Sequence, residues 1–231
     1  MAWFFGRRRP QGEFPEEVGV TTGPHRSPGL TALSEELDKR RVEAILDLGA
    51  SFHENVRYMS RYCGNIVIRD LVNAHGDELS GPRASLYRLD VDSVEAADET
   101  RYDAILLWDL LHYVERPRLA DFAGRLARLA RPGALALLLA SATTPIPMTP
   151  VQFRIRDRNC LIYQVRGERR SPAPQFTPRT VERLFPGFRP LRFFQLRNGL
   201  QEFLLQNASS GAPELEEASR PARPRQPGDW Y

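Results

Sequence analysis

The sequence predicts an α/β fold: a mostly parallel seven-stranded sheet with helices on both faces and an antiparallel hairpin at its end. Short apolar runs alternate with segments of helical periodicity across residues 42–141. Such continuous apolar runs are typical of strands buried between two helical layers. Near the end of the chain, residues 188–196 and 200–206 flank an Asn-Gly dipeptide, a common turn of β-hairpins. The alternation therefore predicts the parallel strands, and the Asn-Gly turn predicts the antiparallel edge.

The rest of the chain is organised around residues 43–70, which read as strand, turn, helix and strand. An apolar run at 44–46 is followed by Asp47 and Gly49, and a second apolar run lies at 65–68. Between the two runs, four side chains recur at the spacing of one helical face: Phe52, Val56, Met59 and Cys63. Parallel strands joined by a helix bind ligands at their carboxyl ends. Asp70 follows the second strand, where such folds hold ribose hydroxyl groups.

The remaining elements of the α/β domain follow in order. A helix is expected at 34–42, and strands are expected at 84–89, 103–108 and 135–139. Another helix, marked by a stripe of Leu and Phe over 119–129, ends at an Arg-Pro-Gly sequence. These elements complete the parallel part of the predicted sheet.

The last third of the domain departs from this alternation. Residues 153–163 read as two strands about an Asp-Arg-Asn turn, and Thr177 is expected to cap a short helix that begins at Pro178. We therefore expect a folded domain over 34–206 with an insert at about 143–176. Residues 1–33 and 207–231 are rich in Pro, Gly and charge and are expected to be tails, disordered or extended.

Composition limits the classes of protein to which the chain can belong. Its 231 residues suit one domain with tails, and the net charge of +3 is too small to indicate nucleic-acid binding by itself. No apolar run approaches the ~18 residues of a membrane-spanning helix. The two cysteines, Cys63 and Cys160, indicate a reducing compartment, so we expect a cytoplasmic protein. No spacing of four metal ligands is present, and no metal site is predicted.

Two segments together resemble the class I S-adenosylmethionine-dependent methyltransferases. The first resembles their motif I, an apolar strand followed by D-x-G-x-G-x-G, with Asp47 and Gly49 present and with Ser51 and His53 in place of the later glycines. The second, RYDAILLWDLLHYVERP followed by a helix and LARPGALALLLA, is similar to the family's later strands and the loops that follow them. The resemblance covers residues 42–141. It implies a Rossmann-like fold and methyl transfer from S-adenosylmethionine to an acceptor, most simply a small molecule.

The resemblance also implies roles for individual residues. Asp47, Gly49 and Ser51 would lie against the methionine end of the cofactor, and Asp70 would accept the ribose hydroxyls. Asp90, or alternatively Asp92, would lie near the adenine amino group, and Asp109 is counted with the cofactor-binding residues. His112 is the candidate general base, although a histidine here can also simply be packed in the core. Asp70 can equally bond loop amides or cap a helix.

Two other functions remain open from the sequence. Ser51 and His53 replace glycines that let backbone approach the cofactor, which favours a non-catalytic relative that binds a protein partner. Alternate arginines at 154, 156 and 158 would share one strand face and could contact RNA, although no aromatic residues interleave them. A solvated arginine face is the simpler interpretation of this row.

Overall fold

The computed structural model describes residues 20–72, 89, 91–94, 100–142, 146–147, 149–166, 169–171 and 175–208. Its main sheet has six strands in the order β10-β11-β5-β4-β2-β3. The β2–β3, β2–β4 and β4–β5 pairs are parallel, and β11 pairs antiparallel with both β5 and β10. The strands of this sheet are β2 (Ala44–Asp47), β3 (Asn65–Ile68), β4 (Tyr102–Trp108), β5 (Ala130–Ser141), β10 (Phe188–Gln195) and β11 (Leu200–Asn207).

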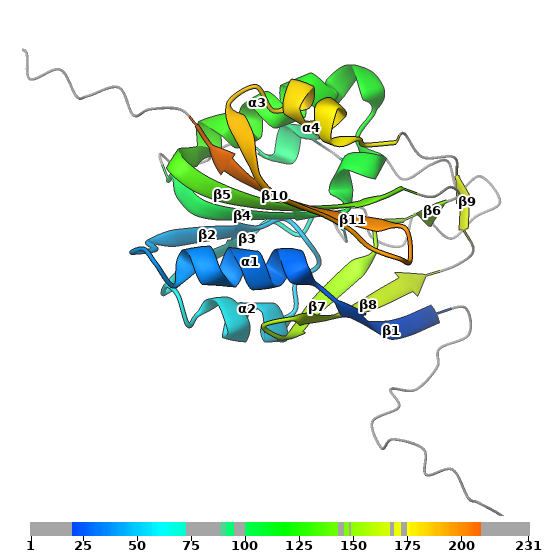
Figure 1. Cartoon of the computed structure of the whole chain (residues 1–231), viewed down its shortest axis with the longest axis horizontal. Helices are drawn as coiled ribbons and strands as arrows, with labels where there is room; N and C mark the ends of the chain where they lie inside the picture. Colours follow the sequence, from blue (N-terminus) through cyan, green and yellow to red (C-terminus); the bar gives the residue numbers. More distant parts are fainter. Residues whose placement is uncertain are drawn as a thin grey trace, which may run out of the picture.

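Helices cover both faces of this sheet (Figure 1). One face packs on α1 (Pro28–Leu37) and α2 (His53–Met59), and the other packs on α3 (Leu119–Leu129) and α4 (Pro178–Leu184). Successive residues of β4 and β5 alternate between the two hydrophobic cores, because neighbouring side chains of a strand point to opposite faces. Short 3₁₀ turns complete the helical structure at Val91–Val94, Leu110–Tyr113 and Arg116–Arg118.

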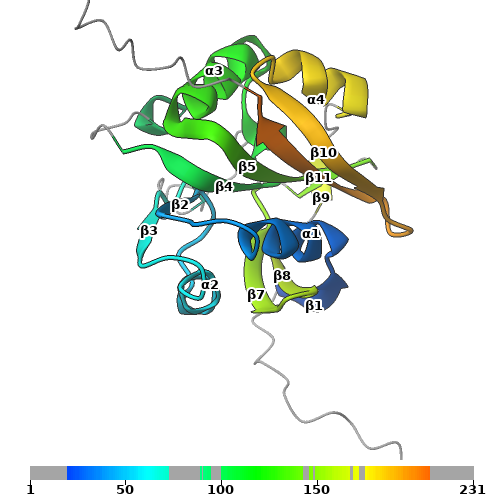
Figure 2. The ribbon, with the colours of Figure 1, turned by 60° about the vertical axis from the view of Figure 1, so that its left-hand side comes forward.

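A second sheet lies beside α1 and α2 (Figure 2). This cap sheet contains β1 (Val20–Arg26), β8 (Cys160–Arg166) and β7 (Gln152–Asp157) in that order, all antiparallel. Its inner side chains Phe153, Ile155 and Leu161 join the same core as α1 and α2. Two short strands, β6 (Ile146–Pro147) and β9 (Arg169–Ser171), form a further antiparallel pair.

Asn55 on α2 attaches the cap sheet to the Rossmann-like domain. Its side-chain amide donates to the carbonyl oxygen of Phe153 at 3.0 Å, and its side-chain oxygen accepts from the amide of Ile155 at 2.7 Å. The Asn55 side chain thus pairs with the β7 backbone as a neighbouring strand would. The insert is therefore held directly over the helix that follows β2.

The main corrections to the sequence-based fold concern the sheet and the start of the domain. In place of the expected seven-stranded sheet, the described residues form a six-stranded mixed sheet and the separate cap sheet. Residues 84–88 of an expected strand, and residues 209–231 of the expected C-terminal tail, lie outside the described residues. The expected tail at 1–33 contains β1 and most of α1, so the folded part begins by Val20.

The first helix also differs from its expected bounds of 34–42. It starts at Pro28 because Ser27 caps it, accepting a hydrogen bond from the amide of Leu30, and because proline suits the first helical turn. The hairpin of β7 and β8, the hairpin of β10 and β11, and the Thr177 cap of α4 are confirmed. Within the described residues, no helix has the length and apolarity needed to cross a membrane.

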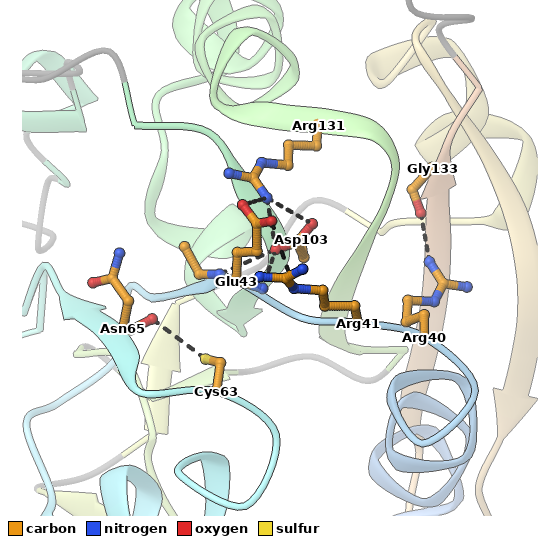
Figure 3. A network of polar contacts seen from close by, with 9 residues as sticks. Arg40, Arg41, Glu43, Cys63, Asn65, Asp103, Arg131 and Gly133 are labelled. Carbon is orange, nitrogen blue, oxygen red and sulfur yellow. Dashed lines mark hydrogen bonds and ion pairs between the residues drawn. The ribbon is translucent and has the colours of Figure 1, made fainter.

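Paired charges hold together the amino ends of β2, β4 and β5 (Figure 3). Asp103 accepts hydrogen bonds from the backbone amides of Glu43 and Ala44, at 2.7 and 3.0 Å. Arg131 lies 2.6 Å from a carboxylate oxygen of Glu43 and 3.3 Å from one of Asp103. Arg40 donates to the carbonyl oxygen of Gly133, the turn residue with a φ of 76°. Each of these charged groups therefore has a partner of opposite polarity.

Candidate functional site

A cavity of about 200 Å³ lies at the carboxyl ends of β4 and β5, between the main sheet and the cap sheet. This is the end at which open α/β sheets bind their ligands. Its volume is below the roughly 300–1,000 Å³ of pockets for drug-sized ligands, so a smaller molecule fits it. The described residues around it are His25, Asp109, His112, Ser141, Ile146, Pro147, Val151, Phe153, Tyr163, Val165, Asn198 and Leu200.

Asp109, the first residue after β4, is a buried carboxylate at the wall of this cavity. One carboxylate oxygen, Oδ2, accepts from the amide of Val151 at 3.0 Å. The other, Oδ1, is buried and has no hydrogen-bond partner among the described residues. Burial raises the pKa of Asp109 to about 7, because the charged form loses its hydration. Asp109 Oδ1 can therefore accept a hydrogen bond from a ligand. Because the pKa of this side chain is near neutral, it can also accept a proton.

His112 lies one turn later on the same side of the cavity. Its Nε2 accepts a hydrogen bond from the amide of Ser141 at 2.8 Å, so in the neutral ring the proton is on Nδ1. Within the described part of the chain, that Nδ1 has no partner. Burial lowers the pKa of His112 to about 4, and its ring meets the edge of Phe176. His112 is therefore neutral at pH 7 and offers one unused N–H donor.

His25, from β1 of the cap sheet, contributes a second acceptor. Its Nε2 lies 2.7 Å from a carboxylate oxygen of Glu202, a fully buried residue of β11. Because a carboxylate accepts, His25 donates through Nε2, which leaves the lone pair of the neutral ring on Nδ1. Asn198, in the turn between β10 and β11, lies 3.5 Å from that Nδ1. The other carboxylate oxygen of Glu202 accepts from the amide of Gly29 at the start of α1.

Two aromatic rings of the cap sheet complete the lining. Phe153 on β7 and Tyr163 on β8 are directly paired across the strands. The Tyr163 ring lies over Gly23 of β1, where an added Cβ would come within 2.7 Å of its hydroxyl oxygen. Glycine is thus required at this strand position so that the tyrosine can lie flat against the backbone. The cavity therefore combines polar side chains, including the carboxylate of Asp109 and the N–H of His112, with aromatic and aliphatic walls.

The loop after β2, where the cofactor was expected, packs against Trp108. Asp47 is 2% exposed, and its Oδ1 accepts from the Trp108 indole at 2.7 Å and from the Gly49 amide at 2.9 Å. A Cβ on Gly49 would overlap the indole ring. Burial raises the pKa of Asp47 to about 6, against the opposing effect of these bonds. Glycine at position 49 therefore allows the close approach of an aromatic side chain.

Trp108 has an unusual backbone conformation for its size. Its φ of 51° is in the left-handed region, which bulky residues rarely adopt. The indole is nearly parallel to the Phe153 ring, with 5.5 Å between the ring centres. Trp108 thus links the loop after β2 to the cap sheet, and this contact stabilises an unfavourable backbone conformation.

The other residues expected to hold a cofactor lie in different surroundings. Asp70, half-buried after β3, accepts from the amides of Ser51 and Val72 at 2.9 and 3.1 Å. His53 points to solvent, with 86% of its side chain exposed and Glu54 beside it, so it does not fill the loop. Asp90 lies outside the described residues, and the exposed Asp92 pairs with Arg118 and Arg125.

S-adenosylmethionine, the expected cofactor, fits these residues at one end. Asp70 is at the carboxyl end of β3 beside the loop, where the resemblance places the ribose. Asp47 and Gly49 are engaged with Trp108 in this conformation, so a methionine group does not fit against them unless the indole moves. The structure brings Asp109 and His112 to one cavity and places Asp47, Gly49, Ser51 and Asp70 in an adjoining loop.

Sequence reasoning missed three of the residues that build this region. His25 lies in a segment expected to be a tail, and the isolated Gly-Pro pair at 23–24 hides the strand. Glu202 lies at a position that reads as the polar side of a hairpin, although it is fully buried. From the sequence, Trp108 is identified only as the last apolar residue of a predicted strand.

Two of the three arginines at 154, 156 and 158 pair with other side chains of the protein, and Arg158 lies just after β7. The half-buried Arg154 donates to the Gln164 side chain at 2.6 Å and lies over the Phe52 ring, and Arg158 pairs with Asp38 at 2.9 Å. Arg156 is exposed. The RNA-directed alternative stays a prediction, and two of its three arginines have these other partners.

The chain was compared with known families, curated proteins and solved structures. No family model and no curated protein matches it. A solved S-adenosylmethionine-dependent methyltransferase from Clostridium acetobutylicum is similar in structure, with a TM-score of 0.50 and 9% identity over 78% of this chain and 92% of that one. The 1,6-didemethyltoxoflavin-N1-methyltransferase of Burkholderia thailandensis, solved with S-adenosylhomocysteine, matches with a TM-score of 0.49 and 17% identity over 79% and 78%. At these identities the likeness to the Clostridium protein shows the fold.

Proposed function

We propose that this chain, which has the fold of the class I S-adenosylmethionine-dependent methyltransferases, transfers a methyl group to a small-molecule acceptor. The observation that carries the proposal is the cavity at the carboxyl ends of β4 and β5. Asp109 Oδ1 and His112 Nδ1 are buried beside it without partners among the described residues. Buried polar atoms normally have partners, and a site that leaves two of them unpaired suits a ligand that bonds both.

The loop after β2 would hold the methyl donor. Asp70 would accept its ribose hydroxyls, and the backbone of residues 48–52 would lie against its methionine end after the Trp108 indole turns away. S-adenosylmethionine supplies an electrophilic methyl group, so the chain's main task is to bring an acceptor into line with it. The cavity adjoins this loop, because Phe153 both lines the cavity and stacks on Trp108.

We assign the role of general base to Asp109. His112 was the candidate from the sequence, but its Nε2 lone pair is engaged by the Ser141 amide and its pKa is lowered to about 4. Asp109 has one unengaged oxygen and a pKa of about 7, which suits a proton acceptor at neutral pH. His112 then positions the acceptor molecule through its Nδ1–H.

The two cysteines support a cytoplasmic location. Both are free thiols in the structure, and burial raises the pKa of Cys63. Free thiols persist in a reducing compartment.

A second candidate function is a non-catalytic binding protein on the same scaffold. The contact of Trp108 with Gly49 and Asp47 favours it, because this contact covers the loop surface that a donor would need. Under this alternative, the cavity binds its small molecule without chemistry, or the cap sheet binds a protein partner.

Calorimetric titration with S-adenosylhomocysteine separates the two functions. Methyl transfer predicts binding in the micromolar range that Asp70→Ala weakens by at least about tenfold, since hydrogen bonds to a charged group contribute about 1.5–3 kcal/mol. Asp121→Ala, which removes an exposed aspartate of α3 that pairs with Arg125, is the matched control and should bind as the wild type does.

The absence of binding by both the wild type and Trp108→Ala would overturn the methyltransferase proposal. Binding by Trp108→Ala alone would show that the indole blocks the donor site and would favour the binding protein. Equal affinity in wild type and Asp70→Ala would place the donor somewhere other than beside β3.

A further inference from the structure

The polarity of the cavity indicates which acceptors it can hold. Two of its buried polar atoms have no partner among the described residues, the acceptor Asp109 Oδ1 and the Nδ1–H donor of the neutral His112, whereas His25 Nδ1 lies 3.5 Å from the side-chain amide of Asn198. Among the lining residues that the structure describes, none is lysine or arginine. A ligand that bonds both unpartnered atoms must therefore place an N–H or O–H donor on Asp109 Oδ1 and an acceptor on His112 Nδ1.

The carboxylates give the cavity a negative character. Asp109 lies in its wall, and the fully buried Glu202 lies directly behind His25. An anionic ligand would bring like charge to a buried carboxylate, at a cost that a low-dielectric site makes large. A cationic ligand would instead supply the missing partner of Asp109 Oδ1, in a cavity that is also lined by the aromatic side chains of Phe153 and Tyr163.

We propose that the cavity binds a small amine, with its nitrogen on Asp109 Oδ1 and an acceptor group on His112 Nδ1. This inference rests on the proposed methyl transfer only for its chemistry, because the binding itself can be measured without the donor. An aromatic or short aliphatic amine suits a cavity of about 200 Å³ that Phe153 and Tyr163 help to line.

An amine also suits the acid–base properties of the site. Asp109 Oδ1 takes the proton that the ammonium group must lose, which turns a buried ion pair into two neutral groups. The nitrogen lone pair then forms the new N–C bond while the S–C bond of the sulfonium breaks and its electron pair returns to sulfur. The product leaves as an N-methylammonium ion that keeps its two N–H protons, and Asp109 returns the proton that it took to solvent.

The test compares three probes of the same shape: benzylamine, benzyl alcohol and benzoate. We expect benzylamine to bind the wild type at least about tenfold more tightly than benzyl alcohol, and benzoate not to bind, because a charged hydrogen bond contributes about 1.5–3 kcal/mol. Asp109→Asn should lose that tenfold preference and keep its affinity for the alcohol. Asp121→Asn, on the exposed surface of α3, is the matched control and should keep the wild-type preference.

The pH dependence of benzylamine binding is a second test, which can be made on the wild type. Asp109 is protonated below its pKa of about 7, so benzylamine binding should weaken several-fold between about pH 8 and about pH 6 while benzyl alcohol binding stays level. The titratable groups that face Asp109 across the cavity are His25 and His112, and Tyr163 lies on the cap-sheet side. Asp109→Asn should bind benzylamine with no change over this range.

Several results would overturn the amine site: benzoate or benzyl alcohol binding as tightly as benzylamine, or Asp109→Asn keeping the amine preference. If Asp109→Asn does not fold, the wild-type ratio and its pH dependence decide alone. A parallel titration with S-adenosylhomocysteine keeps the two proposals distinguishable. If benzylamine binds and S-adenosylhomocysteine does not, only the methyl-transfer proposal is contradicted. If S-adenosylhomocysteine binds and benzylamine does not, only the amine site is contradicted.

Discussion

Strand β4 has an aspartate at each end, and the two are in opposite states. Asp103, at the amino end, bonds two backbone amides and lies 3.3 Å from Arg131, which also pairs with Glu43 (Figure 3). Asp109, at the carboxyl end, is more deeply buried, and its Oδ1 has no partner in the described part of the chain. A paired charge stabilises the fold, whereas an unpaired buried charge lowers its stability.

This difference indicates that the amino end of the sheet contributes to stability and that the carboxyl end is suited to binding. In the described part of the chain, Asp103, Glu43 and Arg131 at the amino ends are paired with one another or with backbone amides. The carboxyl ends leave Asp109 and His112 unsatisfied and place the left-handed Trp108 between them and the β2 loop. Proteins retain such destabilising groups where binding or catalysis needs them.

The largest expected effect is on how the stability of the protein depends on pH. Asp109 binds its proton more tightly in the folded state, where its pKa is about 7, than in the unfolded state, where it is 3.8. The stability that this group contributes is therefore greatest below about pH 4 and is lost as pH rises to about 7. At 1.36 kcal/mol per pKa unit, the loss is on the order of 4 kcal/mol.

Asp109→Asn should remove this loss. Urea denaturation at several pH values measures the free energy of unfolding of both proteins. Between about pH 4 and about pH 8, this free energy should rise for the variant relative to the wild type by on the order of 4 kcal/mol. Asp47, with a pKa raised to about 6, adds a loss of the same sign to both proteins and cancels in the comparison. Two stability curves that stay parallel across this range would contradict the account.

A buried carboxylate that does have partners should behave in the opposite way. Glu202 bonds His25 and the Gly29 amide at the start of α1. Glu202→Gln should therefore destabilise the protein by about 2–3 kcal/mol near neutral pH, because two charge-assisted hydrogen bonds are weakened. Urea denaturation measures the loss, with the same change at an exposed glutamate of α4, Glu182→Gln, as the matched control. A cost below about 0.5 kcal/mol would show that the pairing of Glu202 does not matter.

The smallest expected effect is at the amino ends. Arg131 is one-third exposed and pairs with Glu43, which is half-exposed. Arg131→Ala should cost about 1 kcal/mol at low salt and less at about 1 M salt, where exposed ion pairs are screened. Urea denaturation at two salt concentrations, with Arg179→Ala on the exposed surface of α4 as the control, checks this. A cost of more than about 3 kcal/mol that does not change with salt would contradict this prediction, because only a buried ion pair is expected to behave in that way.

The sequence predicts the parts of the fold that depend on local pattern. The apolar runs of β2, β4 and β5 and the turns of both hairpins are visible in neighbouring residues. β1 is not, because Gly23 and Pro24 interrupt it with residues of weak strand propensity. It also pairs with β8, more than 130 positions away, in the register Val20 to Arg166. Separation of the insert into its own sheet likewise depends on long-range pairing.

The candidate site divides in the same way. Asp109 and His112 follow a predictable strand, so their place at its carboxyl end could be expected. Their protonation states could not, because these depend on Ser141 and Val151 from other segments. Gly49 was expected to admit a cofactor, and it admits Trp108, since a glycine permits close approach without specifying the neighbour.

One measurement tests the contrast between the two ends most directly: the shift in thermal unfolding midpoint caused by benzylamine in wild type, Asp109→Asn and Arg131→Ala. A ligand that binds only the folded state raises the midpoint. The account predicts that Arg131→Ala starts lower than the wild type and shifts by the same amount, whereas Asp109→Asn starts higher and does not shift. A wild-type shift in Asp109→Asn would contradict the claim that the unpaired carboxylate at the carboxyl end of β4 is there to bind a ligand.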